Sequence, residues 1–352
     1  MSKKSILKAR GILGIMLLTV AILFFNGFLT PVRSDELWDA FGDLDEWYTP
    51  ASHDVGGNII GLNDIAFETQ VLLAHETTSV QRERPRRLLP TPEYLEQLMD
   101  FNYLTRSIFL VDRDTVLLPT DIDVPAFLEK DLTIDTHVEG PQVLIFHVHS
   151  MEEFIDSDPN DPMSGIMGVG RYLAEVLSEV HGIEVMHYTG RFDVVNGISH
   201  RPGSYERMEP VIRQILEDNP SIQMVIDLHR DGIPETSPPL ITYIDGKRTA
   251  QIMFFNGLSR RYRNGQITNL DWLHNPYQRE NLALSFNLQL AANQLYPGIA
   301  RRIYLREFRY SLHMMPLSTL IEVGAQNNTK QEALNAMHPL ANIIAAVILG
   351  ED

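Results

Sequence analysis

The chain has 352 residues, 44% of them hydrophobic and 21% charged, which is enough for two globular domains of ordinary size. Its formal net charge of -17 argues against sequence-independent binding to nucleic acid, because such binding requires a basic surface. The absence of cysteine excludes disulfides and thiolate ligands, so a metal site would have to use His, Asp and Glu.

The N-terminus carries a membrane-targeting pattern. Basic residues at Lys3, Lys4, Lys8 and Arg10 precede an apolar run of 19 residues, 11–29, which is just long enough to span a bilayer as a helix. Basic residues before the run and acidic residues after it predict that the N-terminus is cytoplasmic and the rest extracytoplasmic. A cleaved signal peptide is the alternative, but no Ala-x-Ala-type site follows. We therefore predict that residues 1–33 form a cytoplasmic tail and a single-pass anchor in the cell membrane.

Residues 34–135 have mixed polarity and scattered prolines, and they contain no motif that indicates chemistry. Two short apolar pieces, 108–111 and 116–118, are predicted to be strands or packing segments. We interpret 34–135 as a small membrane-proximal region of unknown role.

From about residue 135 the sequence alternates between apolar strands and amphipathic helices. The strands are predicted at 143–147, 183–186, 224–228 and 317–323. The helices are predicted at 170–180, with Gly182 as its stop, at 208–217 and at 281–295. Thr329 and Glu332 form a capping-box pattern for a last helix, which Pro339 should kink or divide. This alternation predicts one α/β domain over 136–352, a doubly wound open sheet with flanking helices.

Polar residues follow three of these strands, at the end where open α/β sheets bind ligands. They include His149 and Glu152 after the first strand, His229 after the third, and Glu322 within the last. Two imidazoles and one carboxylate are the protein ligands of a hydrolytic zinc site, which leaves the fourth position for water. A further carboxylate nearby can act as general base and then as acid. Glu322 has apolar neighbours in the sequence, where a carboxylate is costly unless it is paired or binds metal.

The same segments resemble a known family. The heptapeptide IDLHRDG at 226–232, the Tyr-Pro-Gly turn at 296–298 and the segment IEVGAQNN at 321–328 match, in order and spacing, the stage II sporulation protein P (SpoIIP) family. The resemblance covers about 140–347 and extends to the single N-terminal anchor. It implies an amidase-like α/β fold with one catalytic zinc. The implied activity is that of an N-acetylmuramoyl-L-alanine amidase on peptidoglycan, with stem-peptide cross-links as a further target.

The family setting is remodelling of the septal cell wall during engulfment in sporulation. The implied partners are SpoIID and SpoIIM, and also SpoIIQ. Two rival functions stay open, namely a zinc peptidase that acts only on stem peptides and an inactive wall-binding scaffold.

The resemblance also implies roles for individual residues. It makes His149, Glu152 and His229 the zinc ligands and Glu322 the catalytic carboxylate. Strand alternation would point His147 to the same side as His149, so His147 is an alternative ligand or a support for the ligands.

Three further residues are candidates for contact with the substrate or the ligands, namely Arg230, Asp231 and Arg309. The tetrapeptide at 309–312, Arg-Tyr-Ser-Leu, departs from the Arg-Tyr-Asn-Gln that is usual in the family.

Overall fold

The computed structural model describes residues 89–349, which belong to one compact unit. The predicted anchor at 11–29 and most of the region 34–135 lie outside the described residues. Within 89–349 no helix combines the length and apolarity that a membrane span requires.

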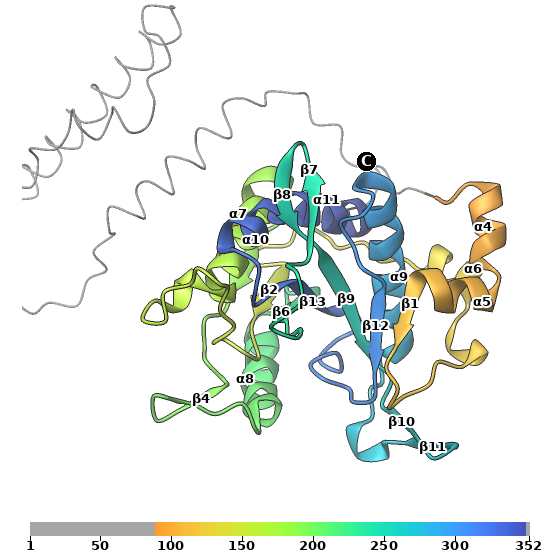
Figure 1. The fold of residues 1–352 in the computed structure, drawn as a ribbon, viewed down its shortest axis with the longest axis horizontal. Helices are drawn as coiled ribbons and strands as arrows, with labels where there is room; N and C mark the ends of the chain where they lie inside the picture. The colour runs from red at the N-terminus through yellow and green to blue at the C-terminus, as the bar shows by residue number, and fades with distance from the viewer. Residues whose placement is uncertain (1–88, 350–352) are drawn as a thin grey trace, which may run out of the picture. The chain divides into compact units, whose positions relative to one another are not determined.

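A seven-stranded sheet runs through the middle of this unit, in the order β1-β12-β9-β13-β6-β2-β3 (Figure 1). Its strands are β1 (Phe109–Val111), β2 (Val143–Phe146), β3 (Val185–His187), β6 (Met224–Asp231), β9 (Ile252–Gly257), β12 (Ile303–Arg306) and β13 (Ser318–Ala325). Neighbouring strands are parallel except for β9 and β13, which run antiparallel. The predicted open α/β sheet is confirmed, and the antiparallel pair is a departure from the simple doubly wound pattern.

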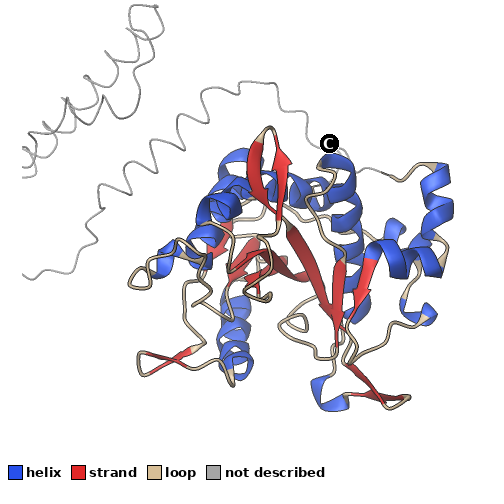
Figure 2. Ribbon diagram, viewed as in Figure 1, coloured by secondary structure: helices blue, strands red, loops and turns tan. Residues whose placement is uncertain are grey.

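Helices cover both faces of the sheet (Figure 2). The larger helices are α7 (Ile166–His181), α8 (Ser204–Asp218), α9 (Gln278–Leu295) and α11 (Met337–Ile348). The smaller ones are α4 (Pro92–Leu98), α5 (Phe101–Tyr103), α6 (Val124–Glu129) and α10 (Lys330–Asn335). Short hairpins are formed by β4 (Val194–Val195) with β5 (Ile198–Ser199), β7 (Ile241–Ile244) with β8 (Lys247–Ala250), and β10 (Arg260–Arg263) with β11 (Gln266–Asn269).

Alternation along the central strands separates two cores. Val143 and Ile145 of β2 face the large core that contains residues of α7, α9 and α11. Leu144 and Phe146 face a smaller core with Met208 and Ile212 of α8. The α8 face is the one that carries the chemistry, because the polar residues described below alternate onto it.

Local sequence signals explain where the helices end. Gly182 takes a left-handed conformation at φ 69°, and the amides of Gly182 and Ile183 donate to carbonyls in the last turn of α7, as in a Schellman ending. Thr329 and Glu332 form the predicted capping box at α10. The predicted division of the last helix is also observed, since α10 ends at Asn335 and Pro339 lies in the first turn of α11.

The region before residue 135 is more closely joined to the sheet than predicted. The segment 109–111 forms β1, which pairs with β12 at the edge of the large sheet, and Asn287 of α9 donates a hydrogen bond to the Phe127 carbonyl of α6. The segment 116–118 is not a strand, although Leu117 is buried. Within 89–349, both contacts join residues on either side of the expected boundary at 135.

Candidate metal centre

Three neighbouring strands deliver the predicted site residues to one edge of the sheet. The loop after β2 carries His149 and Glu152, β6 carries His229, and β13 carries Glu322. Glu322 is in direct register with His229. The structure therefore brings these four side chains together at the edge of the sheet where the sequence predicted that they would meet.

His149, Glu152 and His229 form a group that could hold a metal ion, since their ligand atoms all lie within 4.8 Å of one another. The Glu152 carboxylate lies between the two imidazoles, with Oε1 at 3.5 Å from His149 Nδ1 and Oε2 at 3.3 Å from His229 Nδ1. Tetrahedral zinc with bonds of about 2.0–2.1 Å needs ligand atoms roughly 3.3–3.4 Å apart. The donor set therefore fits zinc, and both carboxylate–imidazole distances are close to that spacing. His149 keeps 18% of its side chain exposed, which leaves the group open to solvent on that side.

Asp227 orients the His229 ring. The two residues alternate onto the same face of β6, and His229 Nε2 lies 2.7 Å from Asp227 Oδ1. The same carboxylate accepts hydrogen bonds from the Val148 amide and the Ser311 hydroxyl. With Nε2 close to this carboxylate and Nδ1 close to Glu152, the ring offers Nδ1 to a metal, and a carboxylate behind the ring is the usual arrangement for a zinc-bound histidine.

Charge complementarity dominates this buried cluster. Burial opposes ionisation of His229, Glu152 and Asp227 alike. For His229 the negative charges of Asp227 and Glu152 outweigh burial and hold its pKa well above the ordinary value. Conversely, burial would raise the pKa of Glu152 and of Asp227, yet the His229 imidazolium keeps both of them low. Without metal, His229 is therefore a cation between two anions.

Glu322 has the opposite character. Burial raises its pKa to about 8, against the attraction of His229 and with a contribution from the negative charge of Glu152. The side chain is half-buried, and its buried Oε2 has no hydrogen-bond partner in the described part of the chain. A carboxyl that titrates near neutrality beside a metal position is suited to proton transfer.

Hydrogen bonds and close packing hold both the side chain and the backbone of Glu152 in place. Its Oε2 accepts from the Arg230 amide at 2.8 Å, and its Oε1 pairs with Arg201 at 2.5 Å. Its carbonyl accepts from the Ile166 amide at 3.0 Å, and a Cβ on Gly165 would come within 2.7 Å of that oxygen. Glycine at 165 is thus needed for the loop to approach α7 so closely.

His147 does not join the group, so the expectation that it points to the same side as His149 is wrong. Its Nδ1 donates to the Leu228 carbonyl at 2.7 Å, which leaves Nε2 to accept from His187 Nε2 at 2.9 Å. Burial lowers the pKa of His147 to about 4, so the ring is neutral. The reason is that β2 ends at Phe146, and strand alternation no longer applies to the loop that follows.

The other three candidates have structural partners. Arg230 Nε donates to the Glu153 carbonyl, and Asp231 pairs with Arg301 at 2.6 Å rather than with the His229 ring. Arg309 pairs with Glu209 of α8 at 2.8 Å. Arg230 therefore braces the loop that carries Glu152, and the carboxylate that contacts the His229 ring is Asp227 rather than Asp231.

Sequence reasoning missed two residues that contact this group. Arg201 follows the β4–β5 hairpin, and no motif marked it. Tyr205 lies in the first turn of α8, and its ring meets the His149 ring edge-on at 5.7 Å between centroids. The serine at 311 stands where the family usually has asparagine, and it donates to Asp227.

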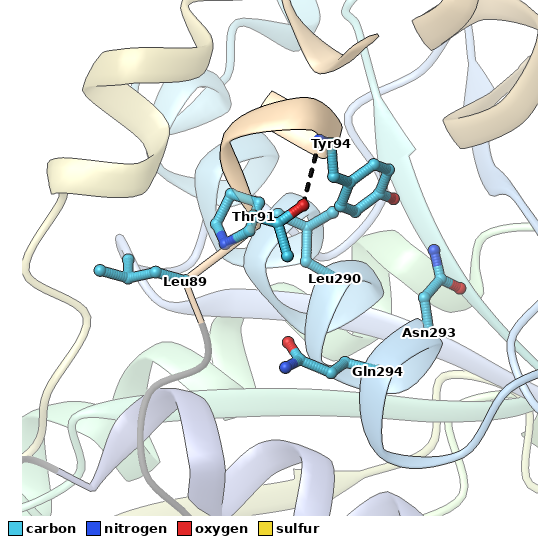
Figure 3. A pocket seen from close by; sticks show the side chains of 7 residues that line it. Leu89, Thr91, Tyr94, Leu290, Asn293 and Gln294 are labelled. Atoms are coloured by element: carbon cyan, nitrogen blue, oxygen red, sulfur yellow. Dashed lines mark hydrogen bonds between the residues drawn. The ribbon is translucent and has the colours of Figure 1, made fainter. Parts of the chain in front are cut away.

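A separate hollow of about 340 Å³ lies between α4 and α9, lined in part by Thr91, Tyr94, Leu290 and Asn293 (Figure 3). It contains none of the residues of the metal group, so we assign no chemistry to it.

Comparison with known proteins agrees with these features. Residues 75–345 match the family model of stage II sporulation protein P. A stage II sporulation protein P of Bacillus subtilis strain 168 is 21% identical over 296 residues, which cover 79% of this chain and 66% of that protein. The chain thus spans slightly less than two thirds of that relative.

Among solved structures, the amidase AmiC2 of Nostoc punctiforme is 15% identical, with a TM-score of 0.33 over 60% of this chain and 97% of its own. An N-acetylmuramoyl-L-alanine amidase of Clostridium difficile is 19% identical, with a TM-score of 0.34 over 59% and 94%. These scores are too low to carry an assignment by themselves. The family match covers well over half of the sequence, and the chain belongs to the stage II sporulation protein P family.

Proposed function

We propose that the protein is a zinc-dependent peptidoglycan hydrolase that cleaves the N-acetylmuramoyl-L-alanine amide bond. The observation that carries the proposal is the convergence of His149, Glu152 and His229, with ligand atoms within 4.8 Å of one another, and the unpartnered Glu322 oxygen beside them. Family membership suggests the biological setting, which is remodelling of the septal wall during sporulation.

The ligand residues and Glu322 would divide the work. Bound zinc would polarise the scissile carbonyl and lower the pKa of a water molecule. The Glu322 carboxylate takes a proton from the attacking water as the new carbon–oxygen bond forms. It then gives that proton to the nitrogen of L-alanine as the carbon–nitrogen bond breaks. Burial raises its pKa to about 8 in the metal-free protein, and the positive charge of a bound zinc would lower that pKa toward neutrality, where both roles are available.

The decisive variant is Glu322→Gln. It should bind one zinc per chain, because Glu322 is outside the ligand group, while hydrolysis of purified sacculi falls by a factor of about 10² to 10⁴. Glu153→Gln is the matched control, since it removes a neighbouring charge without touching the group, and it should retain wild-type turnover. Wall hydrolysis by Glu322→Gln at the wild-type rate would refute the assignment.

Two other outcomes would favour the rival functions. Mass spectrometry of digested sacculi should detect muramic acid with a free lactyl group, which only amidase action produces. Products from cut stem peptides alone would instead indicate a zinc peptidase. Failure of the wild-type protein to bind stoichiometric zinc would indicate a wall-binding scaffold.

We also propose that residues 1–33 anchor the protein in the cell membrane with the hydrolase outside, where SpoIID, SpoIIM and SpoIIQ would be its partners. Because the chain has no cysteine, single cysteines report topology directly. Ser34→Cys should react with a membrane-impermeant maleimide in intact cells, and Ser5→Cys should react only after lysis. The reverse labelling pattern would contradict the proposed orientation.

A further inference from the structure

Tyr205 lies at the metal group without being a ligand. It is the second residue of α8, directly after Gly203 and Ser204, and its ring meets His149 edge-on. On its other side the ring meets Tyr310 at 5.6 Å between centroids, and Tyr310 in turn packs on Phe255 at 4.7 Å. The Tyr205 ring is thus held between a candidate ligand and a buried aromatic cluster.

The start of α8 is itself fixed in place. One turn after Tyr205, Glu209 pairs with Arg309 at 2.8 Å and lies 3.0 Å from His313 Nε2. These contacts join α8 to the loop that also carries Tyr310. A side chain positioned by stacking on two sides and by a braced helix loses little freedom when it binds a ligand.

The hydroxyl of Tyr205 is free to donate. The side chain is half-buried, and no residue of 89–349 hydrogen-bonds to this hydroxyl. The negative charges of Asp227, Glu322 and Glu152 lie close enough to act on the phenol. A tyrosine with an ordinary pKa of about 10 keeps its proton at neutral pH, so the group is a neutral donor there.

On the basis of the proposed amide hydrolysis, we propose that the Tyr205 hydroxyl donates a hydrogen bond to the oxygen of the scissile carbonyl as that carbon becomes tetrahedral. Water forms the new bond to carbon, Glu322 carries its proton to the departing nitrogen, and the Tyr205 proton stays on the phenol throughout. The hydrogen bond from the hydroxyl stabilises negative charge that exists only while the carbon is tetrahedral, so its contribution is to kcat.

The test compares Tyr205→Phe with wild type and with Tyr310→Phe. Tyr205→Phe keeps the ring contacts and removes only the hydroxyl. We expect kcat on a muramoyl-peptide substrate to fall about 10²- to 10³-fold. KM, zinc stoichiometry and melting temperature should stay at wild-type values. Tyr310→Phe should stay near wild type, because the ring that packs on Tyr205 and Phe255 is retained and only the hydroxyl is lost.

A second measurement does not depend on turnover. A phosphinate analogue of the scissile amide carries the tetrahedral oxygens, and Tyr205→Phe should weaken its binding by about the factor lost in kcat. Substrate binding to Glu322→Gln should not change when Tyr205→Phe is added. An unchanged kcat and phosphinate affinity in Tyr205→Phe would overturn this inference alone, whereas wild-type protein that releases no lactyl-muramic ends would overturn the proposed function itself.

Discussion

Zinc binding should expel a proton from His229. In the metal-free protein this ring is held as a cation between Asp227 and Glu152, and its pKa is well above the ordinary value. Zinc needs the lone pair on Nδ1, so each ion that binds near neutral pH must displace one proton. In a Glu322→Gln variant, where the His229 proton is the one displaced, zinc affinity should therefore rise about tenfold, or about 1.4 kcal/mol, for each pH unit near neutrality. That increase continues until the pH passes the raised pKa of His229.

Isothermal titration calorimetry in two buffers of different ionisation enthalpy gives the number of protons directly. Glu322 has a pKa of about 8 and would contribute a second proton in wild type, so the clean measurement uses Glu322→Gln. We expect close to one proton per zinc in that variant at pH 7. In the double variant Glu322→Gln/Asp227→Asn, fewer protons should be released per zinc. The reason is that Asp227, the carboxylate that contributes most to stabilising the His229 imidazolium, has lost its charge. Zinc binding with no proton release and no pH slope would refute the charge assignment at this centre.

Three further changes test the scaffold around the centre. Gly165→Ala places a methyl group 2.7 Å from the Glu152 carbonyl, so thermal unfolding should show a loss of about 1–3 kcal/mol together with weaker zinc binding; unchanged affinity would contradict the close approach. Asp193→Ala removes the acceptor of the Met151 amide and should cost about 1–3 kcal/mol in urea unfolding, with Asp193→Asn recovering part of the loss. Phe286→Ala, in the core distant from the metal group, should cost about 3–5 kcal/mol but leave one zinc bound per chain in metal analysis.

The sequence predicted the parts of the fold that local patterns determine. The apolar strand before His149 and the strand that carries His229 could be located because both are buried on two faces and end in polar residues. Their convergence followed from the rule that parallel strands present their carboxyl ends on one side. Glu322 could be added because its neighbours in the strand are apolar.

What the sequence could not supply depends on partners that are distant along the chain. The direction of β9 is set by its pairing with β13, and nothing within Ile252–Gly257 encodes an antiparallel neighbour. The side to which His147 turns depends on where β2 stops, which is within the usual error of one or two residues. Tyr205 and Arg201 have no motif, because their relation to Glu152 and His149 arises only when α8 and the hairpin before it fold over the sheet edge.

The position of β1 determines where a truncated but active form of this protein can begin. A truncation that starts at 136, where the sequence pattern suggests a domain boundary, would delete Phe109–Val111 and leave one side of β12 without its backbone partner. An edge strand whose backbone N–H and C=O groups are unpaired promotes association between copies of the protein. A soluble version should therefore begin before β1, and one that starts at 136 is expected to self-associate even though every residue of the metal group is retained.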